Sequence, residues 1–193
     1  MHRLPAAAFA SVALLALAAC ASGPPVTPST LVKTPAPAPS FKTGEEDAIL
    51  AIVDQWLLAA GNGDEAAILA LSVPEGSNFA QRRTPASEGA VSRSSIAETA
   101  KRLGGMDHFI ERYWSPTVMV RGGIAMVWAP YELRDNGQVV HCGIDAFDMV
   151  KRDGKWRVGN VMFTMEPEAC GEIKPPSVSV MRPRDGWKET PNQ

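Results

Sequence analysis

Two glycine turns near the C-terminal end of this chain constrain its fold more than any other feature. Asn136-Gly137 and Asp153-Gly154 are dipeptides typical of two-residue β-hairpin loops. They separate three long stretches rich in apolar residues, 124–134, 139–151 and 156–165. A further stretch, 109–120, precedes them and is interrupted at a proline. We therefore expect a meander of antiparallel strands.

The residues before this meander follow helical spacing instead. Thr43 with Glu46 and Ser95 with Glu98 each fit a capping box, in which Ser or Thr is followed three residues later by Glu. Apolar residues recur at helical intervals over 49–60, and Asp64 is placed to cap a second helix. Helices followed by a meander predict one α+β domain over residues 45–172, with N-terminal helices packed on a curved antiparallel sheet.

Two stretches outside these patterns carry weaker signals. Residues 73–93 are polar and rich in turn residues, with a short strand expected near Phe79. Residues 173–193 contain four prolines and few apolar residues, which predicts a loose C-terminal tail. Trp187 is the one residue of this tail that we expect to dock on the domain.

Residues 1–19 have the pattern of a secretory signal peptide. A basic start is followed by an apolar run over 6–19, which is shorter than the roughly 20 residues of a membrane-spanning helix. The run ends in Leu17-Ala18-Ala19-Cys20, which resembles the lipobox of bacterial lipoproteins. The resemblance implies lipidation of Cys20 and, because residue 21 is alanine, anchoring in the outer membrane facing the periplasm. The alternative is an ordinary secretory signal followed by a chance cysteine.

Residues 20–44 differ in composition from everything that follows. Six prolines fall between residues 21 and 44, and the stretch has no acidic residue and few large apolar ones. Such a segment cannot bury enough surface to fold, so we expect a tether between the lipid and the domain. The whole chain has a formal net charge of −2 and no basic run, which argues against nucleic-acid binding.

The other two cysteines, Cys142 and Cys170, would face an oxidising compartment after export. An even pair in that setting predicts a disulfide. Two free thiols, or a metal site that includes His141, are the alternatives, although no CxxC or HxxxH spacing supports a metal. We expect no metal and no other cofactor.

If both turns contain two residues, the hairpins place His141 opposite Glu132, and Asp145 opposite Trp128 and Met162. One face of the sheet then carries aromatic and polar residues that suit a ligand pocket under the helices: Trp128, Glu132, His141, Asp145, Phe147, Trp156, Val158, Asn160, Met162 and Thr164. The other face is almost entirely apolar: Val127, Tyr131, Leu133, Val140, Cys142, Ile144, Ala146, Val161 and Phe163. The assignment of the two faces to core and exterior could be reversed. In the reversed case His141, Asp145 and Glu132 would be solvated. Even with the faces as assigned, a purely structural role is open, in which His141 and Glu132 form a cross-strand ion pair and Asp145 bonds a backbone N–H.

The segment "VWAPYELRDNGQVVHCGIDAFDMVKRDGKW", following the predicted helices, resembles the nuclear transport factor 2-like superfamily, which includes ketosteroid isomerases, scytalone dehydratases and polyketide-cyclase (SnoaL-like) proteins. The pieces "HCGIDAF" (141–147) and "GKW" (154–156) are most similar to its lumazine-binding-like branch. The resemblance covers roughly residues 45–167 and implies a cone-shaped fold. Enzymes of the superfamily use an Asp or an Asp/His pair in the cone, for which Asp145 and His141 would stand here. Many members have lost catalysis.

Two functions remain open from the sequence. The favoured one is a membrane-anchored domain that binds a small apolar or aromatic ligand, or a protein partner, without catalysis. The alternative is an isomerase- or dehydratase-type enzyme, in which His141 or Asp145 abstracts a proton while Asn160 or Thr164 stabilises the oxyanion. The apolar sheet face, together with the back-to-back pairing common in the superfamily, predicts a homodimer through the sheet.

Overall fold

The computed structural model describes residues 43–174, 176–178 and 180–188. The predicted signal peptide, Cys20 and nearly all of the predicted tether lie outside these residues, so the predictions for them stay predictions. Within the described part of the chain, no helix is both long enough and apolar enough for a membrane crossing.

Three helices precede or interrupt the strands: α1 (Glu46–Gly61), α2 (Glu65–Leu71) and α3 (Ile96–Gly104). The Asp64 carboxylate accepts the N–H of Ala67 at 2.9 Å, which confirms the cap of α2. Both halves of the capping box between Ser95 and Glu98 are present at α3.

The first capping box was predicted wrongly. The N-cap of α1 is Glu45 rather than Thr43, and no side chain caps it. The N–H of Thr43 donates to the Glu46 carboxylate at 2.7 Å, so only the acidic half of the motif is used. The Glu45 carboxylate is instead occupied by Lys151 and by the indole N–H of Trp156.

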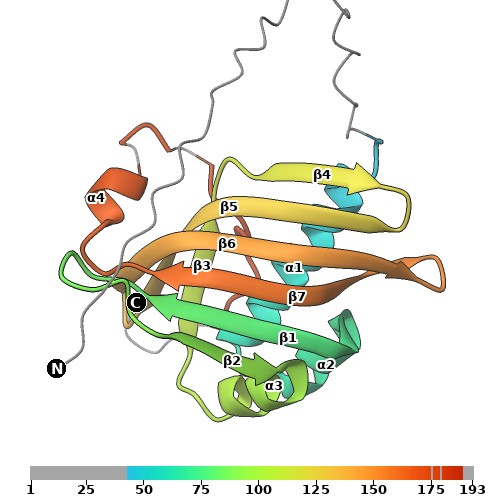
Figure 1. Cartoon of the computed structure of the whole chain (residues 1–193), viewed down its shortest axis with the longest axis horizontal. Helices are drawn as coiled ribbons and strands as arrows, with labels where there is room; N and C mark the ends of the chain where they lie inside the picture. Colours follow the sequence, from blue (N-terminus) through green and yellow to red (C-terminus); the bar gives the residue numbers. More distant parts are fainter. Residues whose placement is uncertain (1–42, 175, 179, 189–193) are drawn as a thin grey trace, which may run out of the picture. The chain divides into compact units, whose positions relative to one another are not determined.

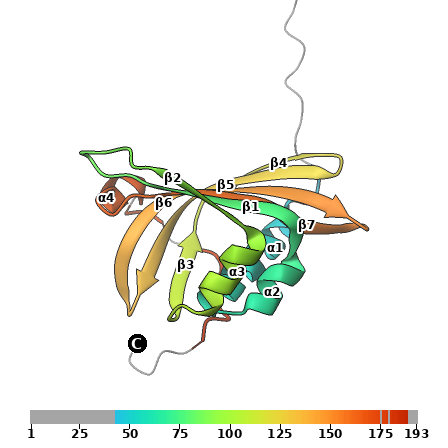
Figure 2. The ribbon, with the colours of Figure 1, turned by 60° about the horizontal axis from the view of Figure 1, so that its bottom comes forward.

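Seven strands form one sheet: β1 (Ser72–Arg82), β2 (Val91–Ser95), β3 (Phe109–Tyr113), β4 (Thr117–Arg121), β5 (Ile124–Asp135), β6 (Gln138–Arg152) and β7 (Lys155–Met165). Their order is β2-β1-β7-β6-β5-β3, and β4 also pairs with β5 (Figure 1). Figure 2 shows α1, α2 and α3 together on one side of the sheet. The face under these helices is called the inner face below, and the opposite one the outer face.

The α+β class is confirmed, but the sheet is mixed rather than antiparallel. β1 runs parallel to β7, whereas the other strand pairs are antiparallel. The sequence predicted only a short strand near Phe79, because Pro74 and Gly76 interrupt β1 and several of its buried residues are polar. The stretch 109–120 forms two strands, which pair with different ends of β5.

Both hairpin turns are as predicted, since Asp135 pairs with Gln138 and Arg152 with Lys155. Beyond the turn of each hairpin, however, one strand has an extra residue that pairs with none on the neighbouring strand. Val140 is the extra residue between the β5–β6 pairs Arg134–Val139 and Leu133–His141. Gly159 is the extra residue in β7, between the pairs formed with Met149 and Asp148. These β-bulges shift the register by one residue and exchange the faces of β5 and β7 relative to β6.

The hydrophobic core lies between α1 and the inner face of the sheet. It includes most of the apolar residues of α1 together with Val127, Tyr131 and Val161, each at most 2% exposed. The sequence placed these three on the face opposite His141 and Asp145, and the two bulges explain why that prediction was wrong. Gly143 faces Tyr131 across the β5–β6 pair, and a Cβ there would lie 2.0 Å from the Thr164 carbonyl oxygen. The Tyr131 hydroxyl reaches across this position and donates to that oxygen at 2.7 Å.

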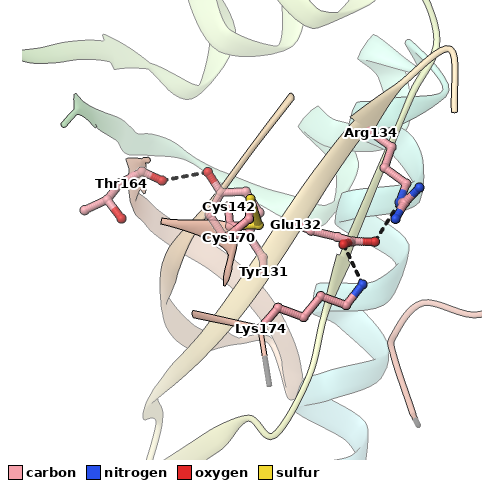
Figure 3. Close-up of a disulfide and its surroundings, with 7 residues drawn as sticks. All are labelled: Tyr131, Glu132, Arg134, Cys142, Thr164, Cys170 and Lys174. Atoms are coloured by element: carbon pink, nitrogen blue, oxygen red, sulfur yellow. Dashed lines mark hydrogen bonds and ion pairs between the residues drawn. A yellow bond between two sulfur atoms is a disulfide. The ribbon is translucent and has the colours of Figure 1, made fainter. Parts of the chain in front are cut away.

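The predicted disulfide between Cys142 and Cys170 is present (Figure 3). It links β6 to the short helix α4 (Cys170–Ile173) and excludes the alternatives of free thiols and a metal site with His141. The same segment carries Lys174, whose ammonium lies 2.6 Å from the Glu132 carboxylate. Arg134 contacts the other oxygen of Glu132, so this buried outer-face carboxylate is neutralised (Figure 3).

The prediction of a loose C-terminal tail is wrong for the residues around Arg182. Arg182 and Tyr113 exchange both backbone hydrogen bonds, at 2.7 and 2.8 Å. The Arg182 guanidinium also forms an ion pair with Asp54 of α1 at 2.6 Å. Trp187 docks as predicted, because its ring lies so close to Gly61 that a Cβ there would meet it at 2.5 Å. The C-terminal segment around Arg182 therefore bonds to both α1 and the edge strand β3 and holds them together.

Candidate functional site

A cavity of about 150 Å³ lies between the helices and the inner face of the sheet. Apolar side chains from α1, α3, β5 and β7 form most of its wall, and five polar ones, Asn78, Arg102, Glu111, His141 and Asp145, also line it. Arg102 of α3 and the Met106 side chain beyond it line the cavity and are exposed, so it meets solvent beside the end of α3. A small apolar cavity with a few convergent polar groups is the usual form of a ligand site.

Asp145 and Glu111 form a hydrogen-bonded carboxyl pair in this cavity. Asp145 lies on β6 and is 2% exposed, and Glu111 comes from the edge strand β3. Burial raises the pKa of Asp145 well above its usual range, and the neighbouring Glu111 raises it further. Burial also raises the pKa of Glu111 to about 7, against the opposing effect of its hydrogen bond with Asp145. Because a bond between two carboxyl groups needs a proton, the pair holds at least one proton at neutral pH.

His141 lies on the same face of β6 and is held neutral. Burial, with a smaller effect of the Arg82 charge, lowers the pKa of His141 to about 4. Its ring meets the ring of Tyr131 edge-on, with 5.7 Å between the centroids. Burial raises the pKa of Tyr131 above its usual range, so both rings are uncharged near neutral pH.

Three buried polar atoms of the cavity have no hydrogen-bond partner among the described residues: Oδ2 of Asp145, Oδ1 of Asn78 and Nδ1 of His141. Each of these residues is at most 7% exposed. Leaving a buried polar group unpaired costs about 1–3 kcal/mol, so native proteins contain few of them. Three such atoms around one cavity indicate that their partners come from a bound molecule or from water.

The helix side of the cavity is held in place by its own contacts. The Trp56 indole N–H donates to the Ser72 hydroxyl at 3.1 Å, and that hydroxyl donates to the Ile68 carbonyl at 2.8 Å. The Trp56 ring also meets the ring of Phe147 edge-on, with centroids 5.7 Å apart. The aromatic part of the wall is therefore fixed before any ligand arrives.

Of the nine predicted pocket residues, His141 and Asp145 line the cavity. Phe147 and Trp156 also lie on the inner side but belong to the core. The other five lie on the outer face, because the bulges at Val140 and Gly159 shift β5 and β7 by one residue: Trp128, Glu132, Asn160, Met162 and Thr164.

The two predicted oxyanion donors are therefore wrong. The Asn160 amide accepts the N–H of Ser77 and donates to the Asp148 carboxylate. The Thr164 hydroxyl donates to Glu166 at 2.8 Å. Neither side chain lines the inner cavity, whereas the Asn78 amide does.

Glu111 and Asn78 were not predicted as site residues from the sequence. A signal for Glu111 exists, because it lies between Phe109 and Tyr113 at alternate positions of β3, and both of these are buried. In a strand, alternate residues share a face, so a carboxylate between two buried aromatics is expected to point inward. Asn78 had no comparable signal, since strand β1 itself was not predicted in full.

A larger hollow, of about 380 Å³, lies between the 83–88 loop and α4. It is more open and lined largely by charged groups, of which Arg83 and Glu166 pair with each other at 3.3 Å. None of the unpartnered buried atoms lines it. The inner cavity is therefore the better candidate site.

The sequence matches no protein-family model and no curated protein. Solved structures do share its fold. A nuclear transport factor 2-like protein from Pseudomonas putida is 15% identical, with a TM-score of 0.52, over 65% of this chain and 89% of that protein. One from Novosphingobium aromaticivorans is 16% identical, with a TM-score of 0.51, over 63% and 81%. A protein with a cystatin-like fold from Nostoc punctiforme is 11% identical, with a TM-score of 0.53, over 67% and 96%. The chain has the nuclear transport factor 2-like fold, as its sequence predicted.

Replacing Glu111 with Gln should change how stability depends on pH. The pKa of Glu111 is raised from 4.5 to about 7, so between these values the folded protein keeps a proton that the unfolded chain has released. Glu111 therefore lowers the free energy of unfolding as pH rises through this interval, by roughly 3 kcal/mol. In urea unfolding at stepped pH, the Glu111→Gln variant should gain stability relative to the parent across the interval and keep that gain above it.

His141 acts in the opposite direction, because its pKa is lowered and its protonation destabilises the fold as pH falls from 6.5 to about 4. The His141 effect is the same in the parent protein and in the Glu111→Gln variant. It therefore cancels when one curve of unfolding free energy against pH is subtracted from the other. Glu168→Gln, on the exposed surface, is the control. A difference curve as flat for Glu111→Gln as for the control would contradict a buried, protonated Glu111.

Proposed function

We propose that this domain binds a small, largely apolar organic molecule in the inner cavity. The observation that supports the proposal most is the set of three buried polar atoms, on Asn78, His141 and Asp145, that lack partners around one mostly apolar space. A ligand with one polar end would satisfy these atoms and bury the remainder of its surface against Trp56 and the neighbouring apolar wall.

The size of the cavity limits the ligand. Sites for drug-sized molecules usually measure about 300–1,000 Å³. A cavity of about 150 Å³ suits a single ring or a short aliphatic chain better than a multi-ring molecule. Among the described residues that line it, only Arg102 and Met106 are exposed, so we place the route of access beside them.

Acid–base catalysis in the same cavity is the second candidate, and the carboxyl pair favours it. A carboxyl with its pKa near neutrality can both give and take a proton at the working pH. Asp145 and Glu111 share a proton, and the neutral His141 ring lies on the same face of β6. Such a group could move a proton next to a carbonyl, as in an isomerase or dehydratase. Binding is the first candidate because it requires only the cavity and its unpaired atoms.

Met106→Trp should block access to the cavity without affecting the core, because Met106 is 50% exposed at its rim. Benzyl alcohol, titrated into the protein and followed by the methyl NMR signal of Met165 inside the cavity, should bind at least about tenfold more weakly to this variant. Ile124→Trp is the matched control, since Ile124 is 63% exposed and lines neither the cavity nor the groove on the outer face. Equal binding to both variants would rule out this route.

We also propose that the domain is anchored to the outer membrane through a lipid on Cys20. The support comes from the sequence, in which "LAAC" directly follows an uninterrupted apolar run and precedes a proline-rich segment. The acyl chains of such a lipid hold a protein at the membrane by about 0.8 kcal/mol per buried CH₂.

Cys20→Ser should release the protein from membranes or leave it with its signal peptide, because serine lacks the thiol that accepts the lipid. Fractionation of cell envelopes and the gel mobility of the variant would test this. A variant that partitions and migrates like the parent protein would contradict the proposal.

Finally, we propose a homodimer through the outer face. The predicted dimer face is corrected, because Val127, Tyr131 and Val161 are core residues. The outer face nevertheless carries an apolar patch around a shallow groove of about 170 Å³. This outer patch consists of Phe79, Val91, Trp128, Ile144, Ala146 and Met162. Symmetric pairing of two copies would remove it from water.

Ile144→Asp should convert the dimer to a folded monomer, because a carboxylate in the centre of a paired apolar patch is desolvated without a partner. Sedimentation at micromolar concentration would measure the change in mass. Val139→Asp, at an exposed position nearer the hairpin of the same strand, should leave the dimer intact. A parent protein that sediments as a monomer would refute the proposal.

A further inference from the structure

We infer that the ligand of the inner cavity is a small apolar amine, bound as its ammonium cation against the Asp145–Glu111 carboxyl pair. This inference rests on the proposed binding function and specifies its ligand class. It starts from the charge and the hydrogen-bonding capacity of the groups that line the cavity.

The atom that most limits the ligand is Oδ2 of Asp145. It is buried and, apart from the bond that its carboxyl shares with Glu111, has no partner among the described residues. Whichever of the two carboxyls holds the shared proton, the pair keeps at least one oxygen outside that bond as a hydrogen-bond acceptor. A ligand that satisfies it must bring a donor, which an amine, an alcohol or a phenol can do and a carboxylate cannot.

The other two unpaired atoms, on Asn78 and His141, can also accept hydrogen bonds, so the three together suit a ligand group with several hydrogen-bond donors. The Asn78 carbonyl oxygen is an acceptor, and the neutral His141 ring can present Nδ1 as one. An ammonium group has three N–H donors and no acceptor, so it matches three acceptors around one space. A hydroxyl has a single O–H and would leave acceptors unpaired.

Charge selects the cation over the neutral alcohol. With one shared proton the carboxyl pair carries one negative charge, and no described cation forms an ion pair with Asp145 or Glu111. A buried charge is costly unless it is paired. The ammonium would supply the missing counter-charge, and the Trp56 ring in the wall adds an aromatic surface of the kind that cations favour.

The other charged or titratable groups near the pair do not change state around neutral pH. His141 of β6 is neutral because its pKa is lowered to about 4, and Tyr131 of β5 is neutral because its pKa is raised. Arg82 of β1 and Arg102 of α3 stay positive. From α1 and β7 the cavity receives only uncharged residues. The carboxyl pair is therefore the group whose charge changes, and it becomes more negative as pH rises through about 7.

Three probes of similar size separate the ligand classes: benzylamine, benzyl alcohol and benzoate. Each is titrated into the full chain near pH 8 and near pH 5.5, with the Met165 methyl signal as the readout. Benzylamine should bind about tenfold or more tightly than benzyl alcohol near pH 8, as expected for a charge-assisted bond. Its advantage should shrink near pH 5.5, where the pair gains a second proton while a primary amine stays charged.

Asp145→Asn should remove the preference for benzylamine while benzyl alcohol still binds. Asp148→Asn is the matched control, because Asp148 lies on the same strand but is exposed on the outer face. If Asp145→Asn does not fold, the release of a proton on benzylamine binding near pH 6.5 is measured in the parent protein by calorimetry in two buffers, and binding without proton release would overturn the amine.

The outcomes distinguish this inference from the proposed function. Benzyl alcohol or benzoate binding as tightly as benzylamine at both pH values would overturn the amine and leave the cavity as a binding site. The same preference retained in Asp145→Asn would also overturn it. No shift of the Met165 methyl signal with any probe would instead refute the proposed function itself.

Discussion

The register of β6 with its two neighbouring strands, β5 and β7, determines which side chains lie on the inner face. Val140 in β6 and Gly159 in β7 are each left out of the pairing, so each flanking strand shifts by one residue. Because side chains alternate along a strand, each shift exchanges the two faces of the neighbouring strand. As a result Val127 and Tyr131 of β5 point to the same side as Asp145. Removing the bulge at Val140 would place Trp128 in the core and a core residue of β5 in water.

These bulges also bring together the carboxyl groups of distant strands. Asp145 is on the central strand β6, and Glu111 is on β3 at the edge of the sheet, separated from β6 by β5. Their contact depends on the position of β3, which is fixed by Tyr113. Its backbone pairs with Arg182, and its hydroxyl donates to Asp54 at 2.8 Å. The C-terminal segment thus supports the site from outside it, and any loosening of β3 would separate the two carboxyls before it disturbed the core.

Much of this fold could be predicted because its signals are local. The turns at Asn136-Gly137 and Asp153-Gly154, the caps at Asp64 and Ser95, and the three long strands all depend on residues within a few positions of one another. The disulfide followed from the cysteine count and the predicted export signal. The bulge at Val140 could not be predicted in this way, whereas Gly159 carried a local signal, since an isolated glycine within a strand suggests a bulge. Val140 looks like any other strand residue.

The candidate site shows the consequence of that limit. Asp145 and His141 were predicted as a pair because both lie on β6, and residues of one strand keep their relation to each other whatever the neighbouring strands do. Every predicted partner on β5 and β7 was displaced, since it depended on the register. Glu111 and Asn78 were missed because they come from β3 and β1, which reach the cavity through the topology of the sheet and not through a hairpin.

The same alternation places the two proposed binding surfaces back to back on β6. Asp145 faces the cavity, while Ile144 and Ala146 on either side of it belong to the outer patch. A partner bound to the outer patch would therefore contact the residues on either side of Asp145. Conversely, the buried carboxyl pair is stabilised only if that backbone stays in place, because a proton shared between two side chains requires a short and fixed separation. Covering the outer patch would hold the sheet at this point, so dimer formation and a well-defined cavity are expected to support each other.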